Sequence, residues 1–401
     1  MKSRKRRDYK AAPLDNPPLR DLCADARQAW LSATEQSHLD YAEKLYRVFL
    51  VRALKRQNEG SDPPSDREGD DAVEEARKRL FLLLCQAGKD NEVAPRMRRK
   101  GFTARLARGI LNYTEAPLLA YNKTKSTFVP CAVFDNVLPS SALEALVNVF
   151  CPVDANYWNA HGYCVEPPTP FFSYVLPMAE ANSYGAMGVL AMAVKAHAKE
   201  HFGDKVDRSV YAEFWAHNRP HACGHQMHFD SDDEGRNGIR NPLAGSIFYL
   251  GADGLGGPSL VTDQPFGAQQ LARCGWFCWP KKNRLVVFDG TMLHGVIPGK
   301  GFVSDLTKRR VTLMVALWET IKVRPGVGPG SARPLPSKVE TRTTHQWLRD
   351  LCECNHGHGK ITKATRMMPQ TVAPVWETIS GEPWDHLTMG MPAYDAAFQG
   401  F

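Results

Sequence analysis

The stretch HQMHFDSDD, residues 225–233, decides both the fold and the chemistry that we predict for this chain. His228 and Asp230 are two positions apart, and in a β-strand residues at this spacing project from the same face. The stretch belongs to a series of short β-forming runs separated by turn residues, at 210–216, 226–229, 245–250, 259–262, 284–288 and 310–318. Many short strands at such spacing predict an antiparallel barrel or sandwich.

The third candidate ligand is His294, in the stretch RLVVFDGTMLHGVIP at residues 284–298. A hydrophobic strand there leads into a turn, and the histidine follows at the start of the next strand. Two neutral imidazoles and one carboxylate on one face of an octahedron leave three open positions, which is the arrangement of non-haem Fe(II) oxygenases. His228, Asp230 and His294 are therefore our candidate metal-binding and catalytic residues. The open positions would receive a bidentate 2-oxo acid and O2.

A cation for the far carboxylate of such a 2-oxo acid is expected in KRRVTLMVALW, residues 308–318. We choose Arg310, because its guanidinium can bind a carboxylate with two parallel hydrogen bonds. Thr312 lies on the same face of the predicted strand and could add a hydroxyl group. Arg309 has the opposite parity and is the second choice.

Four stretches resemble the catalytic domain of the prolyl-hydroxylase-like branch of the Fe(II)- and 2-oxoglutarate-dependent dioxygenases. They are AVFDNVLPSSALEALV at 132–147, HFD at 228–230, SIFYLGADGLGGPSLV at 246–261, and RLVVFDGTMLHGVIP at 284–298 together with RRVTL at 309–313. The resemblance covers residues 128–320, about half of the chain. It implies an α+β fold with a double-stranded β-helix (jelly-roll) core, in which helices near 140–150 and 184–202 pack on one sheet.

The same resemblance implies the reaction and its cofactors. Fe(II), 2-oxoglutarate as co-substrate and O2 are expected, with ascorbate as a candidate reductant. Tyr249 matches a tyrosine that in relatives can hydrogen-bond the 2-oxoglutarate carboxylate. The expected reaction is oxidative decarboxylation of 2-oxoglutarate coupled to hydroxylation, or a related oxidation, of a protein side chain or a small molecule. Asp230 favours hydroxylation over halogenation, because relatives that halogenate lack this carboxylate.

Two other functions stay open. The chain could be a non-catalytic jelly-roll binding module that keeps the motif by descent, although the complete ligand set and Arg310 argue against this. It could also be an oxygenase acting on nucleic acid, because basic residues cluster at 2–7 and 96–100. The second, spaced arginine that is typical of alkylated-base repair relatives is not apparent after Arg310.

The rest of the chain divides around this core. We predict a disordered basic tail at 1–17, a helical region at 18–125 with an acidic linker near 58–71, the jelly-roll dioxygenase domain at 126–324, and a Pro- and Gly-rich C-terminal extension at 325–401. Apolar periodicity predicts helices at 19–54, 72–87 and 93–111. The extension is expected to be irregular, with one short helix near 345–352.

Composition narrows the class of protein. The 401 residues are 43% hydrophobic and 23% charged, with a net charge of +7, which is ordinary for a globular enzyme. No apolar run approaches the roughly 18–20 residues that span a bilayer, and the first residues, MKSRKRRDYK, are polar. We therefore expect neither a membrane protein nor a secretory signal. The ten scattered cysteines are expected to be reduced thiols, in the cytoplasm or the nucleus.

Three further groups could carry chemistry. CECNHGHG supplies Cys352, Cys354, His356 and His358 as ligands for a second metal. Their alternate spacing strains a tetrahedral site, so a surface turn is the preferred interpretation. Cys274 and Cys278 are expected to be buried thiols and not a redox pair. Three histidines before the metal motif could line the pocket, but we interpret them as solvated loop residues; they are His217, His221 and His225.

Overall fold

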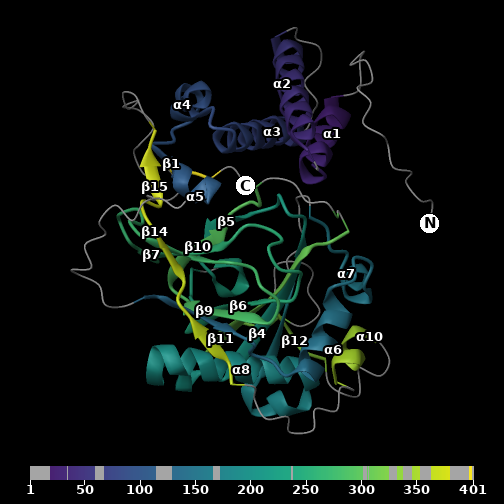
Figure 1. Cartoon of the computed structure of the whole chain (residues 1–401), viewed down its shortest axis with the longest axis vertical. Coiled ribbons are helices and arrows are strands. Elements are labelled where there is room, and N and C mark those ends of the chain that lie inside the picture. The colour runs from purple at the N-terminus through teal and green to yellow at the C-terminus, as the bar shows by residue number, and fades with distance from the viewer. Residues whose placement is uncertain are drawn as a thin grey trace. The chain divides into compact units, whose positions relative to one another are not determined.

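The computed structural model of the chain is shown in Figure 1. It describes residues 19–33, 35–58, 67–113, 129–165, 172–235, 238–300, 305, 307–324, 332–336, 346–352, 363–379 and 397–399. The predicted tail at 1–17, most of the predicted linker, and three of the four candidate ligands in CECNHGHG lie outside these residues. The contacts divide the chain into two compact units, Met1–Leu83 and Leu84–Phe401. The four-part division predicted from the sequence is finer and stays a prediction.

The first unit is helical. It contains α1 (Leu19–Leu31), α2 (Gln36–Asn58) and most of α3 (Arg67–Gln86). α1 packs on α2, and both bury an apolar stripe that includes Trp30 and Tyr46. The prediction of one continuous helix over 19–54 is wrong. The Ser32 hydroxyl donates to the Gln28 carbonyl at 2.6 Å, a local bond that competes with helix continuation.

The second unit begins with a helix that is shorter than predicted. α4 spans Asp90–Arg99, and the predicted helix over 93–111 is wrong after residue 99. Gly101 has a φ of 90°, a conformation that glycine adopts without a steric penalty. The chain then forms β1 (Ala104–Leu106) and α5 (Arg108–Asn112). β1 pairs with β15 (Trp376–Thr378) and β16 (Ala397–Phe398), partners that are too distant in sequence for local periodicity to reveal.

The larger sheet of this unit contains eight strands. In spatial order they are β12 (Ala332–Pro334), β3 (Ser173–Pro177), β4 (Tyr211–Arg219), β11 (Arg310–Trp318), β6 (Ala244–Tyr249), β9 (Arg284–Asp289), β2 (Cys131–Asp135) and β13 (Thr365–Met367). β12 and β3 are parallel, and the other neighbours are antiparallel. β4 and β11 pair over nine residues, so register partners lie on the same face of the sheet, and every second pair shares that face.

The smaller sheet contains five antiparallel strands. Their order is β14 (Gln370–Val372), β8 (Gly275–Cys278), β7 (Ser259–Pro265), β10 (Met292–Val296) and β5 (His225–His228). The structure thus contains a strand at each of the six positions predicted from β-forming runs. β3 and β8 have no predicted counterpart. Both are short and almost wholly buried, so they lack the alternation that marks a half-exposed strand.

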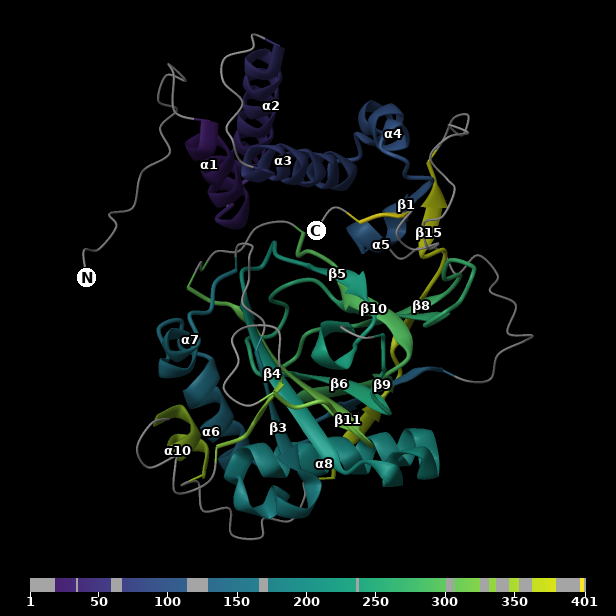
Figure 2. The ribbon, with the colours of Figure 1, turned by 180° about the vertical axis from the view of Figure 1, so that it is seen from behind.

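Two apolar cores hold these layers together. One lies between the sheets and includes Ile247 and Val261. The other lies between the larger sheet and the helices α6 (Ser140–Phe150), α7 (Asn156–Ala160), α8 (Gly185–Phe202) and α10 (Gln346–Cys352). Figures 1 and 2 show α8 lying across one face of the larger sheet. The α+β class and the packing of the helices near 140–150 and 184–202 on a sheet are confirmed.

The C-terminal extension is more ordered than predicted. α10 confirms the expected short helix, but β12, β13, β14, β15 and β16 add strands to all three sheets of the unit. These strands have only two or three residues each. Segments this short show no periodicity, which explains why the sequence predicts an irregular tail. Within the described part of the chain, no helix has the length and apolar character required to cross a bilayer.

Candidate metal centre

Strand pairing brings together the three predicted metal ligands. His294 on β10 is the direct partner of His228 at the end of β5, and Asp230 follows β5 by two residues. The Nε2 atoms of His228 and His294 lie 3.5 Å and 3.6 Å from Oδ1 of Asp230. One ligand atom from each of the three residues lies within 4.8 Å of the others, the spacing of groups that can share one metal ion.

Backbone carbonyls fix the tautomer of both histidines. Nδ1 of His228 lies 2.8 Å from the Gln226 carbonyl oxygen, and Nδ1 of His294 lies 3.0 Å from that of Met292. A carbonyl can only accept, so each Nδ1 must carry the proton and donate it. The lone pair of each imidazole is then on Nε2, which faces Asp230. This is the tautomer that allows each ring to bind a metal through Nε2.

Burial and mutual contact set the charge of the three groups. Burial lowers the pKa of His294 to about 4, so this ring is neutral near pH 7. Burial also opposes charge on His228, but Asp230 outweighs it and raises the pKa of this histidine. Burial alone would raise the pKa of Asp230, yet the two imidazoles hold it below its ordinary value. Asp230 is therefore an ionised carboxylate, the form that binds a cation.

The three groups open into a cavity between the two sheets. Its lining includes the triad, the apolar side chains of Ile247, Phe288 and Met314, and a set of polar residues from β4, β5 and β11: His217, Arg219, His225, Arg310 and Thr312. Arg310 is only 3% exposed. The predicted second choice, Arg309, is not among the lining residues. The strand parity used in the sequence prediction therefore selects the arginine that lines the cavity.

Arg310 is a buried cation without a carboxylate partner among the described residues. Its Nη2 donates to the Ser259 hydroxyl at 3.0 Å, and its guanidinium carbon lies 5.2 Å from the centre of the Tyr249 ring. Its Nε has no hydrogen-bond partner within the described part of the protein. A Cβ added at Gly256 would lie 2.2 Å from Cδ of Arg310, so glycine is needed where the backbone passes this side chain. Ser259 and Gly256 both lie in the stretch 246–261 that carries the family resemblance, but the sequence analysis assigns neither of them to the site.

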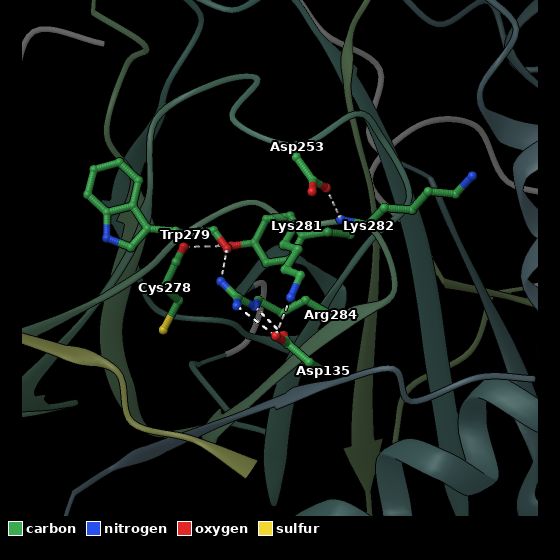
Figure 3. A network of polar contacts seen from close by, with 8 residues as sticks. Asp135, Asp253, Cys278, Trp279, Lys281, Lys282 and Arg284 are labelled. Carbon is green, nitrogen blue, oxygen red and sulfur yellow. Dashed lines mark hydrogen bonds and ion pairs between the residues drawn. The ribbon is translucent and has the colours of Figure 1, made fainter. Parts of the chain in front are cut away.

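Tyr249 supports the arginine from outside the cavity lining. Its hydroxyl lies 2.8 Å from the Ser259 Oγ and donates to the Cys278 carbonyl at 3.0 Å. Figure 3 shows the polar network that continues from Cys278 to Arg284 and Asp135. There Arg284 donates to the Trp279 carbonyl at 3.0 Å and to both oxygens of Asp135. The structure therefore places Tyr249 beside Arg310, with its hydroxyl held by a backbone carbonyl.

Two of the three histidines before the metal motif are part of the cavity. His217 lies on β4 and His225 on β5, and both line it, so their interpretation as loop residues is wrong. Burial lowers the pKa of both far below its ordinary value, so both rings are neutral. His221 does lie in a loop, where its Nδ1 accepts from the Gly256 amide at 2.9 Å.

The cysteines in the described residues are free thiols. Cys274 and Cys278 are buried, as predicted for thiols in an apolar environment, and burial raises the pKa of Cys274 to about 12. Cys352 is half-buried at the end of α10. Because Cys354, His356 and His358 lie outside the described residues, the second metal site stays a prediction.

Comparison with known proteins gives structural similarity without sequence similarity. No family model matches the chain, and no curated protein matches it. A prolyl-4-hydroxylase from Pseudomonas putida is 15% identical, with a TM-score of 0.29, and the match covers 47% of this chain and 87% of that one.

Two further structures show a similar degree of similarity. The carbocyclase SnoK from nogalamycin biosynthesis is 10% identical, with a TM-score of 0.33 and coverage of 52% of this chain and 90% of that chain. HygX from Streptomyces hygroscopicus, with nickel and 2-oxoglutarate bound, is 12% identical, with a TM-score of 0.27 and coverage of 49% and 85%. Each of these three structures is similar to this chain over about half of its length.

Proposed function

We propose that the chain is an Fe(II)- and 2-oxoglutarate-dependent dioxygenase that hydroxylates, or similarly oxidises, a protein side chain or a small molecule. One observation carries the proposal. Two imidazoles and a carboxylate converge in a cavity that also contains a buried arginine with no carboxylate partner among the described residues. The cavity therefore offers a site for a divalent cation and a separate site for an anion.

The donor set fits iron. His228, Asp230 and His294 would hold the metal through Nε2, a carboxylate oxygen and Nε2. Two imidazoles and one carboxylate suit Fe(II) and leave coordination positions open for other molecules. The hydrogen bonds from each Nδ1 to a backbone carbonyl support this role, because they orient the rings and increase the basicity of the ligand nitrogens.

The anion site fits the tail of 2-oxoglutarate. Arg310 would bind the carboxylate remote from the metal, with its guanidinium fork. Thr312 lies two residues further along β11, and its hydroxyl has no partner within the described residues. This hydroxyl would donate to the same carboxylate. Tyr249 would act indirectly, because its hydroxyl is held by Cys278 and Ser259, and its ring orients the arginine.

The strand order supports a double-stranded β-helix as the fold of this core. Along the chain, β4, β6, β9 and β11 lie in the larger sheet, whereas β5, β7, β8 and β10 lie in the smaller one. The chain thus passes repeatedly between two facing sheets. A jelly roll places strands in this way, and the proposed domain corresponds to residues 126–324.

Bound iron, with 2-oxoglutarate and O2, would supply the oxidising chemistry, with decarboxylation of the 2-oxo acid to succinate. The residues of the chain bind, orient and exclude water. Ile247, Phe288 and Met314 form an apolar wall around the polar groups, and this wall limits water near the triad. Such exclusion favours oxidation of a bound substrate over side reactions.

Turnover of 2-oxoglutarate tests the proposal. The purified chain with Fe(II), ascorbate and O2 should release succinate from 2-oxoglutarate, and a library of peptides and metabolites should contain compounds that increase the rate. His228→Ala should abolish succinate release. His38→Ala provides a matched control, because this histidine lies on α2 in the other unit. Fe(II) binding without succinate release, with every candidate substrate, would favour the non-catalytic binding module.

A further inference from the structure

A second arginine lies directly beside Arg310. Arg219 is the last residue of β4, and it is the register partner of Arg310, the first residue of β11. Both side chains line the cavity. Directly opposed residues on antiparallel strands have Cβ atoms about 4.5–5.5 Å apart. Two cationic side chains that start from such neighbouring positions and enter one cavity repel each other unless an anion lies between them.

Neither arginine is neutralised within the described part of the protein. Arg219 forms no ion pair with the described residues, and its Nη1 donates to the Gly224 carbonyl at 2.6 Å. The Tyr163 hydroxyl also contacts this guanidinium: burial raises the pKa of Tyr163, and Arg219 opposes that shift. The Nε atoms of Arg219 and Arg310 are both buried without a hydrogen-bond partner. A buried donor without an acceptor loses its hydrogen bonds to water and gains none in return, so a pair of such donors indicates a missing acceptor.

The next inward-facing pair on the same strands repeats this pattern. Thr312 is the register partner of His217, and both line the cavity. Oγ1 of Thr312 and Nδ1 of His217 also lack partners among the described residues. His217 is neutral at physiological pH, because burial and the two arginines lower its pKa. Two cations and two neutral polar groups therefore face the cavity from adjacent positions on two paired strands.

We propose that Arg219 and Arg310 together bind the tail carboxylate of 2-oxoglutarate, with Thr312 and His217 as neutral hydrogen-bonding groups beside it. This inference rests on the proposed function and assigns a double-arginine clamp to it. One carboxylate has two oxygens and about four lone-pair sites, so it can accept from both guanidinium groups at once. An anion between the two arginines also reduces their mutual repulsion.

Comparing the affinities for two 2-oxo acids, one with and one without a tail carboxylate, tests whether Arg219 binds that carboxylate or has another role. The full chain is loaded with Mn(II) under anaerobic conditions, and calorimetry measures the affinity for 2-oxoglutarate and for 2-oxopentanoate. The second compound has the same carbon chain and metal-binding end but no tail carboxylate. Arg219→Gln should weaken the binding of 2-oxoglutarate by roughly 10- to 100-fold, the effect of losing a hydrogen bond to a charged group. The variant should leave the affinity for 2-oxopentanoate unchanged.

Companion variants make the result specific. Arg310→Gln should show the same selectivity, and the double variant should lose less affinity than the product of the two single losses, because both arginines bind one anion. Arg219→Lys keeps the charge and should retain part of the affinity. Arg309→Gln is the matched control, since that arginine does not line the cavity, and it should change neither affinity.

Three results would overturn the clamp. If Arg219→Gln leaves 2-oxoglutarate affinity intact while Arg310→Gln weakens it, Arg310 binds the tail alone and the proposed function stands. If Arg219→Gln weakens both compounds equally, Arg219 supports the turn at Gly224 and not the carboxylate. If the unmodified chain binds neither compound, the proposed function fails together with the clamp.

Discussion

Arg310 is buried without a carboxylate partner among the described residues, so we expect it to lower the stability of the ligand-free protein while it promotes binding of 2-oxoglutarate. In Arg310→Met, a side chain of similar length and no charge replaces the guanidinium. The change removes an unsatisfied buried donor, worth about 1–3 kcal/mol, and the repulsion from Arg219. It loses one hydrogen bond from a charged group to Ser259, worth about 1.5–3 kcal/mol, and the contact with the Tyr249 ring. Because the variant also removes a buried charge that has no carboxylate partner among the described residues, we expect the ligand-free variant to be at least as stable as the unmodified chain.

The same variant should lose the stabilisation that the co-substrate provides. A ligand present at about 100 times its dissociation constant stabilises the folded state by about 2.7 kcal/mol. In a domain of 150–250 residues, each kcal/mol shifts the melting temperature by about 2–4 °C. Mn(II)-loaded unmodified chain should therefore melt several degrees higher when saturating 2-oxoglutarate is added, whereas Arg310→Met should not respond.

Thermal melting with and without 2-oxoglutarate measures both effects. Arg309→Met is the control, and it should keep the response to the ligand. If the ligand-free Arg310→Met melts well below the unmodified chain, contacts within the protein already stabilise the arginine, and its burial gives no indication of a bound anion. A full ligand response in this variant would likewise contradict its role as the tail clamp.

Three further predictions concern the proposed metal ligand Asp230, the glycine beside Arg310, and the ion pairs of Asp135. Asp230→Ala should abolish 2-oxoglutarate turnover and lower Fe(II) affinity in calorimetry, with an unchanged circular dichroism spectrum; a variant that still turns over would show that the carboxylate is not a ligand. Gly256→Ala should raise the 2-oxoglutarate concentration needed for half-maximal turnover, because the new Cβ would lie 2.2 Å from the arginine Cδ and the φ of this glycine is +79°; unchanged kinetics would contradict the tight approach. Asp135→Asn should destabilise the second unit by about 3 kcal/mol in urea unfolding. This is the lower end of the range for breaking a buried ion pair, and we choose it because one of the two partners of Asp135, Lys281, is 43% exposed to water. Burial raises the pKa of Asp135, but Arg284 and Lys281 outweigh burial and lower this pKa below its ordinary value. The contribution of Asp135 to the free energy of unfolding should therefore be complete above the unfolded pKa of about 3.9, and it should be lost as the pH falls through the lower folded pKa. If the stability of Asp135→Asn falls with acid as steeply as that of the unmodified chain, this reasoning is refuted.

The triad could be predicted because its signals are local. His228 and Asp230 share a face through the two-residue period of a strand, and the apolar run before His294 marks a second strand. Arg310 follows from the same parity, since Arg309 has the opposite parity and is not among the residues that line the cavity. Each inference needs only a few consecutive residues, and the structure brings all four side chains to one cavity.

The second arginine could not be predicted because its meaning depends on long-range pairing. Arg219 precedes His228 by nine residues, and nothing near it in the sequence marks it as part of a site. It becomes a neighbour of Arg310 only through the β4–β11 register, which joins residues 91 positions apart. Ser259 is hidden for the same reason, because its hydroxyl meets Arg310 across the two sheets. Sequence periodicity describes single elements and not their partners.

The most direct test of the central claim is anomalous diffraction from crystals of the full chain soaked with Mn(II) and 2-oxoglutarate. We predict one strong anomalous peak coordinated by Nε2 of His228, a carboxylate oxygen of Asp230 and Nε2 of His294, with the tail carboxylate of the co-substrate at Arg310. A metal peak elsewhere, or a cavity in which these three side chains bind no metal at saturating Mn(II), would contradict the account.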